Sequence, residues 1–345
     1  MKKIVLLSMF GVMVASYSLT AENERFQNGL LFSGNANKGL AQKIADYLQI
    51  EVSPSIVGKF NDGEIQIQAL ESVRNKDVFI VQPTCPCSNQ SVNDNLMELF
   101  LLVRTMKRAS AASITAVIPY YGYARQDRKS SARVPISAAD VALMLEAAGV
   151  DRVVTVDLHC GQIQGFFHNA PVDNLFAAPI FIDYFASKDL TNVVVVSPDA
   201  GGVERANKFV QQLGKKNIPA EMAMISKQRA AAGVISSMNL IGDVTDADAI
   251  IVDDMCDTAG TLVKAAQLLK DKGARRVFAV IPHAIFSGDA LNKIRNSVIY
   301  EMVIADTIPL RAQAPANLTC ISISDLLGEA ILRIHNGESV SELFQ

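Results

Sequence analysis

Short apolar runs recur along the chain from about residue 30 onward, and segments with helical spacing of apolar residues separate them. The runs are rich in Val and Ile and almost free of polar residues, which is typical of strands in parallel sheets that are covered on both faces. They predict strands at 77–82, 114–120, 153–158, 193–199, 249–254, 277–283 and 302–308. Because strands and helices alternate, we expect an α/β fold with mostly parallel sheets.

Two of the intervening segments show the helical pattern clearly. Apolar residues at helical spacing predict a helix over 92–106, with Asn93 or Asn95 available to cap its start. The same spacing predicts a helix over 261–276, and we expect Gly273 to close it, because glycine accepts the left-handed backbone of a helix C-terminus.

The chain also contains an internal repeat. The stretches "DVFIVQP…ITAVIPYY" and "DAIIVDD…VFAVIPHA" both read as strand, helix and strand, and both end in the letters AVIP. Aligning them places Val81 with Val252 and Val117 with Val280. The repeat suggests a duplicated α/β domain. Only the second copy carries an acid-rich turn after its first strand.

Composition and charge limit the classes of protein. The chain has 345 residues, of which 50% are hydrophobic and 19% are charged, and this suits a globular protein of about two domains. We predict an N-terminal extension over 1–24, an N-terminal α/β domain over 25–175 and a C-terminal α/β domain over 176–345. The net charge of -3 and the absence of Trp argue against a nucleic-acid partner. The odd number of cysteines, five, predicts free thiols.

The first residues leave two interpretations open. "MKKIVLLSMFGVMVASYSLTA" has two lysines before an apolar run, as an export signal has, but it could also be an extension that stays on a cytosolic protein. The segment 29–48 supplies a first strand and a helix in which Leu40, Ile44 and Leu48 repeat at core spacing. The fold therefore does not need residues 1–24, and we favour the cytoplasm over export.

The most unusual turn is "AIIVDDMCDTAGT", residues 249–261, which places acids directly after a buried strand. In open α/β sheets, ligands bind at the carboxyl ends of strands. The backbone N–H groups from Asp257 to Thr261 could bind a phosphate at a helix N-terminus, and Asp253 and Asp254 could accept hydrogen bonds from sugar hydroxyls or bind Mg²⁺. A phosphorylated sugar meets both requirements. The simpler alternative is a solvated acidic helix cap.

This turn resembles the phosphoribosyl diphosphate-binding motif, which type I phosphoribosyltransferases share with ribose-phosphate diphosphokinases. The stretches "PYYGYARQDRK", "VDLHCGQIQGFF", "SPDAGGVERA", "SKQR" and "SVSELF" resemble the diphosphokinases, and the resemblance runs from about Leu30 to Phe344. It implies two similar α/β domains and an enzyme for nucleotide biosynthesis. This enzyme would transfer the diphosphoryl group of ATP to O1 of ribose 5-phosphate, giving 5-phosphoribosyl 1-diphosphate and AMP. A phosphoribosyltransferase and a non-catalytic regulatory homologue are the alternatives.

The resemblance also implies roles for individual residues. The ribose 5-phosphate site would comprise Asp253, Asp254, Asp257, Thr258, Ala259, Gly260 and Thr261. The ATP site would comprise Phe60, Asp62, Glu64, Arg125, Gln126 and Asp127. Taken alone, the first three of these read equally well as a hairpin turn. The Mg²⁺ ligands would be His159 and Asp199, and the catalytic cations on a flexible loop would be Lys227 and Arg229.

Self-association and regulation follow from the same resemblance. It implies a homo-oligomer, by resemblance a hexamer, that phosphate and ADP regulate at a site between subunits. The anion-binding residues there would be Gln164, Ser339, Val340 and Ser341. Cys160 and Gly161 depart from the usual pattern of the family next to this site, so we expect altered regulation.

Overall fold

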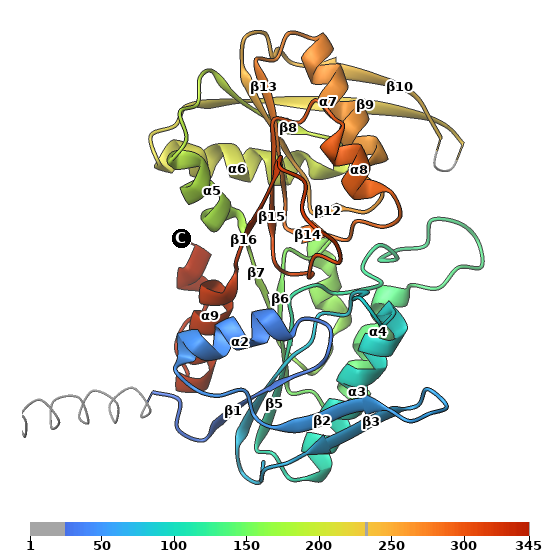
Figure 1. Ribbon diagram of the computed structural model, residues 1–345, viewed down its shortest axis with the longest axis vertical. Coiled ribbons are helices and arrows are strands. Elements are labelled where there is room, and N and C mark those ends of the chain that lie inside the picture. Colours follow the sequence, from blue (N-terminus) through green and yellow to red (C-terminus); the bar gives the residue numbers. More distant parts are fainter. Residues whose placement is uncertain (1–24, 232–233, 345) are drawn as a thin grey trace, which may run out of the picture.

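The computed structural model describes residues 25–231 and 234–344, and side chains within these ranges except those of 227–237 and Phe344. The prediction of an extension over residues 1–24 lies outside the described residues. Two large sheets organise the chain, one in each half, and helices cover them (Figure 1). No helix in the described ranges combines the length and apolarity that a bilayer crossing requires.

The first sheet has five parallel strands in the order β1-β4-β5-β6-β7. Their bounds are β1 Gly29–Ser33, β4 Asp77–Val81, β5 Ser113–Ile118, β6 Arg152–Val156 and β7 Val172–Leu175. A separate antiparallel hairpin, β2 Ser55–Lys59 and β3 Ile65–Ala69, extends from this half. The buried faces of the parallel strands are almost entirely aliphatic, as the apolar runs predict.

The second sheet has seven strands in the order β10-β9-β8-β11-β13-β15-β16, and all neighbours are parallel except β9 and β10. Their bounds are β8 Val193–Ser197, β9 Ala220–Ala231, β10 Val234–Ile241, β11 Asp248–Val252, β13 Arg276–Ile281, β15 Glu301–Ala305 and β16 Leu318–Ile321. Two short strands, β12 Met255–Cys256 and β14 His283–Ala284, pair in parallel beside it.

The helices connect these strands. Their bounds are α2 Lys38–Leu48, α3 Val92–Arg108, α4 Ser137–Ala148, α5 Ala178–Ala186, α6 Val203–Lys215, α7 Gly260–Asp271, α8 Ala290–Arg295 and α9 Ser324–Asn336, with 3-10 turns η1 Gly161–Phe166, η2 Ala200–Gly202 and η3 Ser341–Phe344. All seven predicted strands are present, so the α/β fold with mostly parallel sheets is confirmed.

The predicted helix ends are partly right. Gly273 follows α7 with φ of 91°, as expected of a residue that ends a helix. The expected cap of α3 is wrong, because the capping residue is Ser91 rather than Asn93 or Asn95. The Ser91 hydroxyl accepts from the N–H of Asp94, whose carboxylate accepts in turn from the N–H of Ser91. This reciprocal pair satisfies two backbone donors.

The internal repeat corresponds to equivalent pairs of strands. Val81 of β4 lies opposite Val117 of β5, and Val252 of β11 lies opposite Val280 of β13. The four residues that the sequence alignment equates therefore occupy matching register positions in the two sheets. Each pair is joined by one helix, α3 in the first copy and α7 in the second.

The two halves share a continuous hydrophobic core, because α9 of the second half returns to α2 of the first half. α9 packs against α2, and both contribute to one buried cluster that also includes residues of both sheets (Figure 1). Gly328 permits the close crossing, since a Cβ there would lie 2.4 Å from the ring of Tyr47. Lys43 of α2 also binds Asp306, 2.8 Å away. The predicted domain boundaries at 24/25 and 175/176 stay predictions.

Candidate active site

The acid-rich turn lies at the carboxyl edge of the second sheet. β11 ends at Val252, Asp253 and Asp254 follow it, and α7 begins at Gly260. Ala259, just before the helix, has φ of 59°, and no side chain caps this helix N-terminus. A left-handed non-glycine residue is uncommon. The first N–H groups of α7 are thus left to a ligand, and an anion is the ligand that a helix N-terminus prefers.

The two neighbouring acids differ in environment. Asp254 is buried, its Oδ2 lies 2.6 Å from Nδ1 of His159, and its Oδ1 lies 3.6 Å from Nη1 of Arg205. Burial alone would raise its pKa, but the hydrogen bond from His159 and the charge of Arg205 outweigh burial and hold the pKa of Asp254 well below its usual range. Burial and the charge of Asp254 raise the pKa of Asp253. One carboxylate is thus firmly ionised while its neighbour is disposed to hold a proton.

His159 reaches this turn from the other half of the molecule. It follows β6 of the first sheet, after Asp157, whose φ is 43° and whose carboxylate accepts from the N–H of Ala177. The left-handed backbone at Asp157 is costly for a residue with a side chain and is held by its surroundings. The contact between His159 and Asp254 therefore joins the carboxyl edges of the two sheets.

A cleft of about 1530 Å³ runs between these edges. Ligand sites commonly have about 300–1,000 Å³, so this cleft has room for two substrates. It brings together most of the predicted site residues. Those that line it are Arg125, Asp127, His159, Gln164, Asp199, Asp253, Asp254, Asp257, Thr258, Ala259, Gly260 and Thr261.

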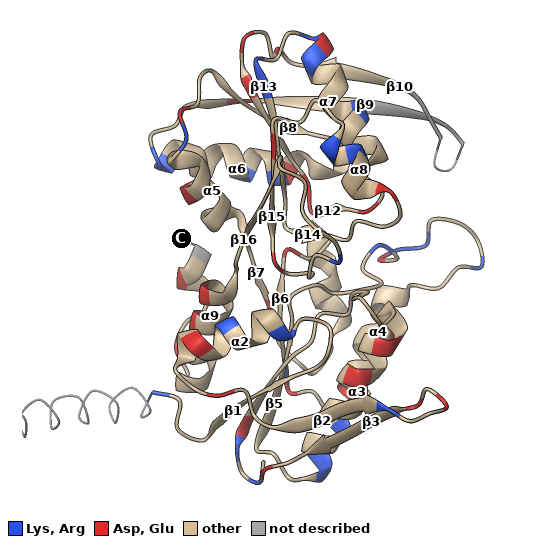
Figure 2. Cartoon of the chain, viewed as in Figure 1, with Lys and Arg blue, Asp and Glu red and all other residues tan. Residues whose placement is uncertain are grey.

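The predicted ATP residues on the loop between β5 and α4 lie beside the acid-rich turn. Nη1 of Arg125 lies 2.7 Å from Oδ2 of Asp257, so the predicted nucleotide and sugar positions adjoin. Asp127 lies 3.1 Å from the thiol of Cys160. The Gln126 side chain accepts from the hydroxyl of Ser137, which ties the loop to α4. Figure 2 shows basic residues along this loop where it extends from the body.

The other predicted ATP residues lie elsewhere. Phe60, Asp62 and Glu64 belong to the turn that joins β2 and β3, the hairpin that Figure 1 shows. None of the three lines the cleft. The Phe60 ring is 52% exposed. The Glu64 N–H donates to Asp62 at 3.1 Å, so the hairpin interpretation of this stretch is confirmed while a nucleotide role is untested within one chain.

The predicted catalytic cations have described backbone only. Lys227 and Arg229 lie in β9, paired with β10, rather than on a loop, and their side chains lie outside the described residues. β8 ends at Ser197 opposite Met224, so the rest of β9 projects past the carboxyl edge of the sheet. That is the edge at which the cleft lies.

The predicted metal ligands, His159 and Asp199, do not form part of a larger ligand cluster among the described residues. In the described part of the chain, no group of three or more His, Cys, Asp or Glu residues could hold a metal ion. His159 bonds to Asp254, and the Asp199 carboxylate accepts from the N–H groups of Gly201 and Gly202. A metal ion here would draw most of its ligands from phosphate oxygens and water, as Mg²⁺ commonly does.

The residues predicted for the regulatory anion site do not all lie in the cleft. Gln164 lines the cleft, whereas Ser339, Val340 and Ser341 do not.

One residue at the acid-rich turn was missed. Arg205 of α6 was not predicted, although its Nη1 lies 3.3 Å from Asp253 Oδ1. The signal was present, since Arg205 lies within the "SPDAGGVERA" stretch that the resemblance singled out.

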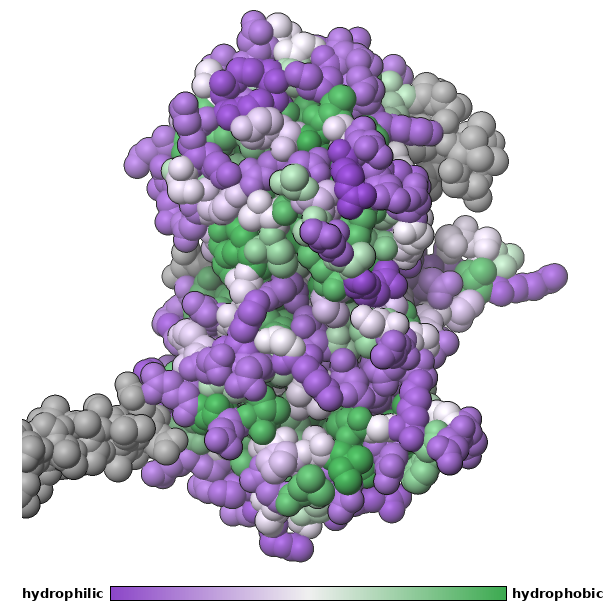
Figure 3. All heavy atoms as spheres, viewed as in Figure 1, coloured by the Kyte–Doolittle hydropathy of each residue, from purple (hydrophilic) through white to green (hydrophobic). Residues whose placement is uncertain are grey.

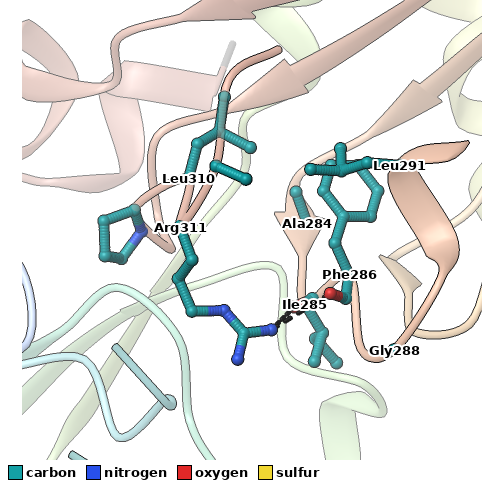
Figure 4. Close-up of a pocket in the computed structure, with 9 residues that line it drawn as sticks. Ala284, Ile285, Phe286, Gly288, Leu291, Leu310 and Arg311 are labelled. Atoms are coloured by element: carbon teal, nitrogen blue, oxygen red, sulfur yellow. Dashed lines mark hydrogen bonds between the residues drawn. The ribbon is translucent and has the colours of Figure 1, made fainter. Parts of the chain in front are cut away.

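A smaller pocket of about 210 Å³ lies behind the turn (Figure 4). Arg311 reaches across it, and its Nη2 donates to the carbonyl oxygens of Ile285 and Phe286 at 2.7 and 3.1 Å. The Phe286 N–H in turn donates to the Cys256 carbonyl. The pocket therefore belongs to the support of the acid-rich turn.

Comparison with known proteins agrees with this geometry. Residues 30–149 match the family model described as the N-terminal domain of ribose phosphate pyrophosphokinase, and 216–345 match the phosphoribosyl synthetase-associated domain. The chain is 53% identical to a ribose-phosphate pyrophosphokinase of Haemophilus ducreyi over 318 residues, which are 91% of this chain and 98% of that protein. It is 51% identical to the enzyme of Wolinella succinogenes over the same shares. The crystal structure of phosphoribosylpyrophosphate synthetase from Mycobacterium smegmatis matches with a TM-score of 0.82 at 37% identity, over 90% of this chain and 100% of that one.

Proposed function

Because this chain belongs to the ribose-phosphate pyrophosphokinase family, we propose that the cleft between its two sheets holds ribose 5-phosphate and ATP side by side. The protein is an enzyme that transfers the diphosphoryl group of ATP to O1 of ribose 5-phosphate and releases AMP. The observation that supports the site assignment is the contact of Arg125 with Asp257, because the residue that we propose for the nucleotide then adjoins the turn that we propose for the sugar phosphate.

The sugar phosphate would bind at the start of α7. Its phosphate would accept from the backbone N–H groups of Thr258, Gly260 and Thr261 and from the hydroxyls of the two threonines. These residues lie next to Ala259, whose backbone is left-handed. Its hydroxyls would donate to Asp253 and Asp254. These acids would repel the phosphate itself, which fixes the orientation of the sugar.

Mg²⁺ is the metal that we propose for the reaction. His159 and Asp199, both lining the cleft, would hold it with phosphate oxygens and water. When bound, the ion would neutralise charge on the transferred phosphates. The protein's own residues would orient the two substrates in line, as such transfer depends mainly on positioning and charge stabilisation.

The exposed hairpin supports a homo-oligomer, which by resemblance is a hexamer. Phe60, Asp62 and Glu64 do not line the cleft of their own chain, so they would reach the nucleotide in a neighbouring subunit's cleft. Exposed apolar side chains accompany them, including Ile56 and Leu70 on the same hairpin. Figure 3 shows apolar residues on the surface over β2 and β3. Such residues favour burial against another subunit.

Mixing two defective variants tests this arrangement. We expect a hairpin variant, Phe60→Ala with Asp62→Asn, and a cleft variant, Asp254→Asn, each to have little activity alone. The activity of hybrid oligomers made by co-expression should exceed the sum of the two separate activities, because some intact clefts then face an intact hairpin of a neighbouring subunit. AMP formation measures the effect. Strictly additive activity would mean that each hairpin serves its own chain.

Regulation by phosphate and ADP is proposed at subunit contacts. Gln164 and the segment of Ser339, Val340 and Ser341 are separate within one chain, so a shared anion site would have to form between chains. Cys160, which lines the same cleft and whose thiol lies 2.8 Å from the side-chain oxygen of Gln162, would alter it. Activity measured with and without phosphate and ADP tests the proposal, and indifference to both would contradict it.

We propose that the working enzyme is cytoplasmic, where its two substrates are made. Deleting residues 1–24 should leave AMP formation unchanged, since the first described strand begins at Gly29. Fractionation with N-terminal sequencing of the native protein is the second measurement. An exported form that begins near residue 19 would contradict the location but not the reaction.

One assay tests the function itself. Purified protein with ATP, Mg²⁺ and ribose 5-phosphate should form AMP and 5-phosphoribosyl 1-diphosphate in equal amounts. A phosphoribosyltransferase would form no AMP from ATP, and a regulatory homologue would form it only when an active partner is added.

A further inference from the structure

His283 is a buried histidine whose ring joins the two halves of the molecule beside the cleft. It belongs to β14, and only 2% of its surface is exposed. Its Nε2 lies 3.0 Å from the carbonyl oxygen of Val156 and 3.1 Å from that of Asp157, both at the end of β6 in the first sheet. A side chain of the second half thus holds the backbone of the first.

The partners define which ring nitrogen carries hydrogen. Carbonyl oxygens only accept, so Nε2 must be the donor. Burial lowers the pKa of His283 to about 4, so the ring is neutral and Nδ1 is an acceptor. Thr307 Oγ1 lies 3.0 Å from Nδ1 and 2.7 Å from the carbonyl oxygen of Pro282, so its one proton has two acceptors within reach. The Tyr120 ring packs edge-on at 5.1 Å between centroids and closes the site around the imidazole.

The same residue also holds the acid-rich turn. The backbone N–H of His283 donates to the carbonyl of Asp254 at 3.0 Å. On its other side, the ring holds the left-handed backbone of Asp157, two residues before His159. His283 therefore contacts both of the segments whose side chains meet in the His159–Asp254 pair. Its ring binds backbone carbonyls of the first segment, and its own backbone N–H binds a backbone carbonyl of the second.

We propose that His283 is a positioning residue that sets the distance between the two catalytic edges and so keeps His159 opposite Asp254. It touches neither substrate position. The importance of the His159–Asp254 pair for turnover rests on the function proposed above. The effect of the His283 ring on the backbone at the end of β6 does not depend on that function. Since a misplacement of about 1 Å can cost roughly 100-fold in rate, a lost tether should reduce kcat by about 10- to 100-fold.

Two substitutions at position 283 separate the tether from simple packing. His283→Gln keeps an amide N–H at the height of Nε2 and can still reach the β6 carbonyls. His283→Asn places its amide at the height of Nδ1, so it keeps the Thr307 contact and loses the β6 contact. We expect the Asn variant to lose kcat with little change in KM, and the Gln variant to recover much of the loss.

Hydrogen exchange of the peptide spanning 153–160 provides a readout that needs no substrate. It should become faster in His283→Asn and stay near wild type in His283→Gln. His335→Gln is a matched control, because His335 of α9 lies 3.2 Å from Asp77 at the opposite end of β4 and also links the last segment to the first sheet. It should lower the unfolding temperature without changing kcat or this exchange.

Defined outcomes would overturn the proposal. Equal losses of kcat in the Asn and Gln variants would assign the effect to packing, and unchanged exchange over 153–160 in the Asn variant would exclude the tether. If His283→Asn does not fold, Thr307→Val removes the donor to Nδ1 and should give the same pattern at smaller amplitude. Unchanged exchange there would also count against the proposal. Faster exchange with normal kcat would instead support the tether by His283 and refute the role in turnover proposed for the His159–Asp254 pair.

Discussion

Asp254→Asn is expected to lower kcat/KM for ribose 5-phosphate by about 100-fold or more. The substitution keeps the shape of the side chain but removes a buried charge that faces His159 and Arg205. Breaking a buried ion pair costs roughly 3–5 kcal/mol where the remaining charge is left unpaired, and here Arg205 keeps Asp253 at 3.3 Å, which reduces that cost. In the proposed site the same change would also remove a charged acceptor for a sugar hydroxyl. Steady-state kinetics with each substrate varied in turn would measure it.

Asp253→Asn is the matched control. Asp253 is the adjacent residue, its side chain is 29% exposed against 5% for Asp254, and its pKa is already raised toward the neutral form by burial and by Asp254. Its loss should therefore be smaller. In the double variant, KM for ATP should rise less than KM for ribose 5-phosphate. Equal effects on both substrates would mean that the acids support the fold in general.

Lys227→Ala and Arg229→Ala are each expected to reduce kcat by about 100-fold or more, with KM values little changed. The backbone of both residues lies on the part of β9 that projects past the carboxyl edge of the second sheet, the edge at which the cleft lies. Removing one donor that stabilises transition-state charge typically costs about 3 kcal/mol. Such a contact raises kcat because it strengthens as charge redistributes during the transfer.

Lys216→Ala is a suitable control for these two variants. It removes a cation from the same half, at the end of α6, where Lys216 pairs with Asp183 and does not line the cleft. Its turnover should match the wild type. If the Lys227 and Arg229 variants also keep near-normal turnover, the assignment of the catalytic cations is wrong.

The sheets could be predicted from sequence because parallel strands buried on both faces leave a strong apolar signal. Even the repeat was informative at the level of register, since Val81 and Val252 occupy equivalent positions opposite Val117 and Val280. The cap of α3 was mispredicted because two asparagines near the start obscured the Ser91–Asp94 pair. Local patterns of this kind compete within a few residues, and only geometry decides between them.

The site was predictable where a motif is contiguous and unpredictable where the fold assembles it. The acid-rich turn is a single stretch, so its proximity to a helix N-terminus followed from the sequence. His159 contacts Asp254, which lies 95 residues away in the sequence, and this contact depends on how the two sheets approach each other. The sequence had grouped His159 with Asp199 alone. For the same reason, His283 was not identified, since its role comes from contacts between the two halves. Arg205 lies in a stretch that the resemblance included, but its contact with Asp253 joins two distant segments of the second half.

The return of α9 to α2 has a consequence for how the enzyme is made. The face of α2 that bears Leu40 and Ile44 is covered by the last long helix, Ser324–Asn336. During synthesis α2 is made long before α9, so this apolar face emerges before the helix that covers it. The nascent first half must therefore wait, with part of its core exposed, until α9 has been translated. Ribosome-bound chains should need protection from chaperones throughout that interval, and loss of the last turns of α9 should harm the earliest part of the protein most.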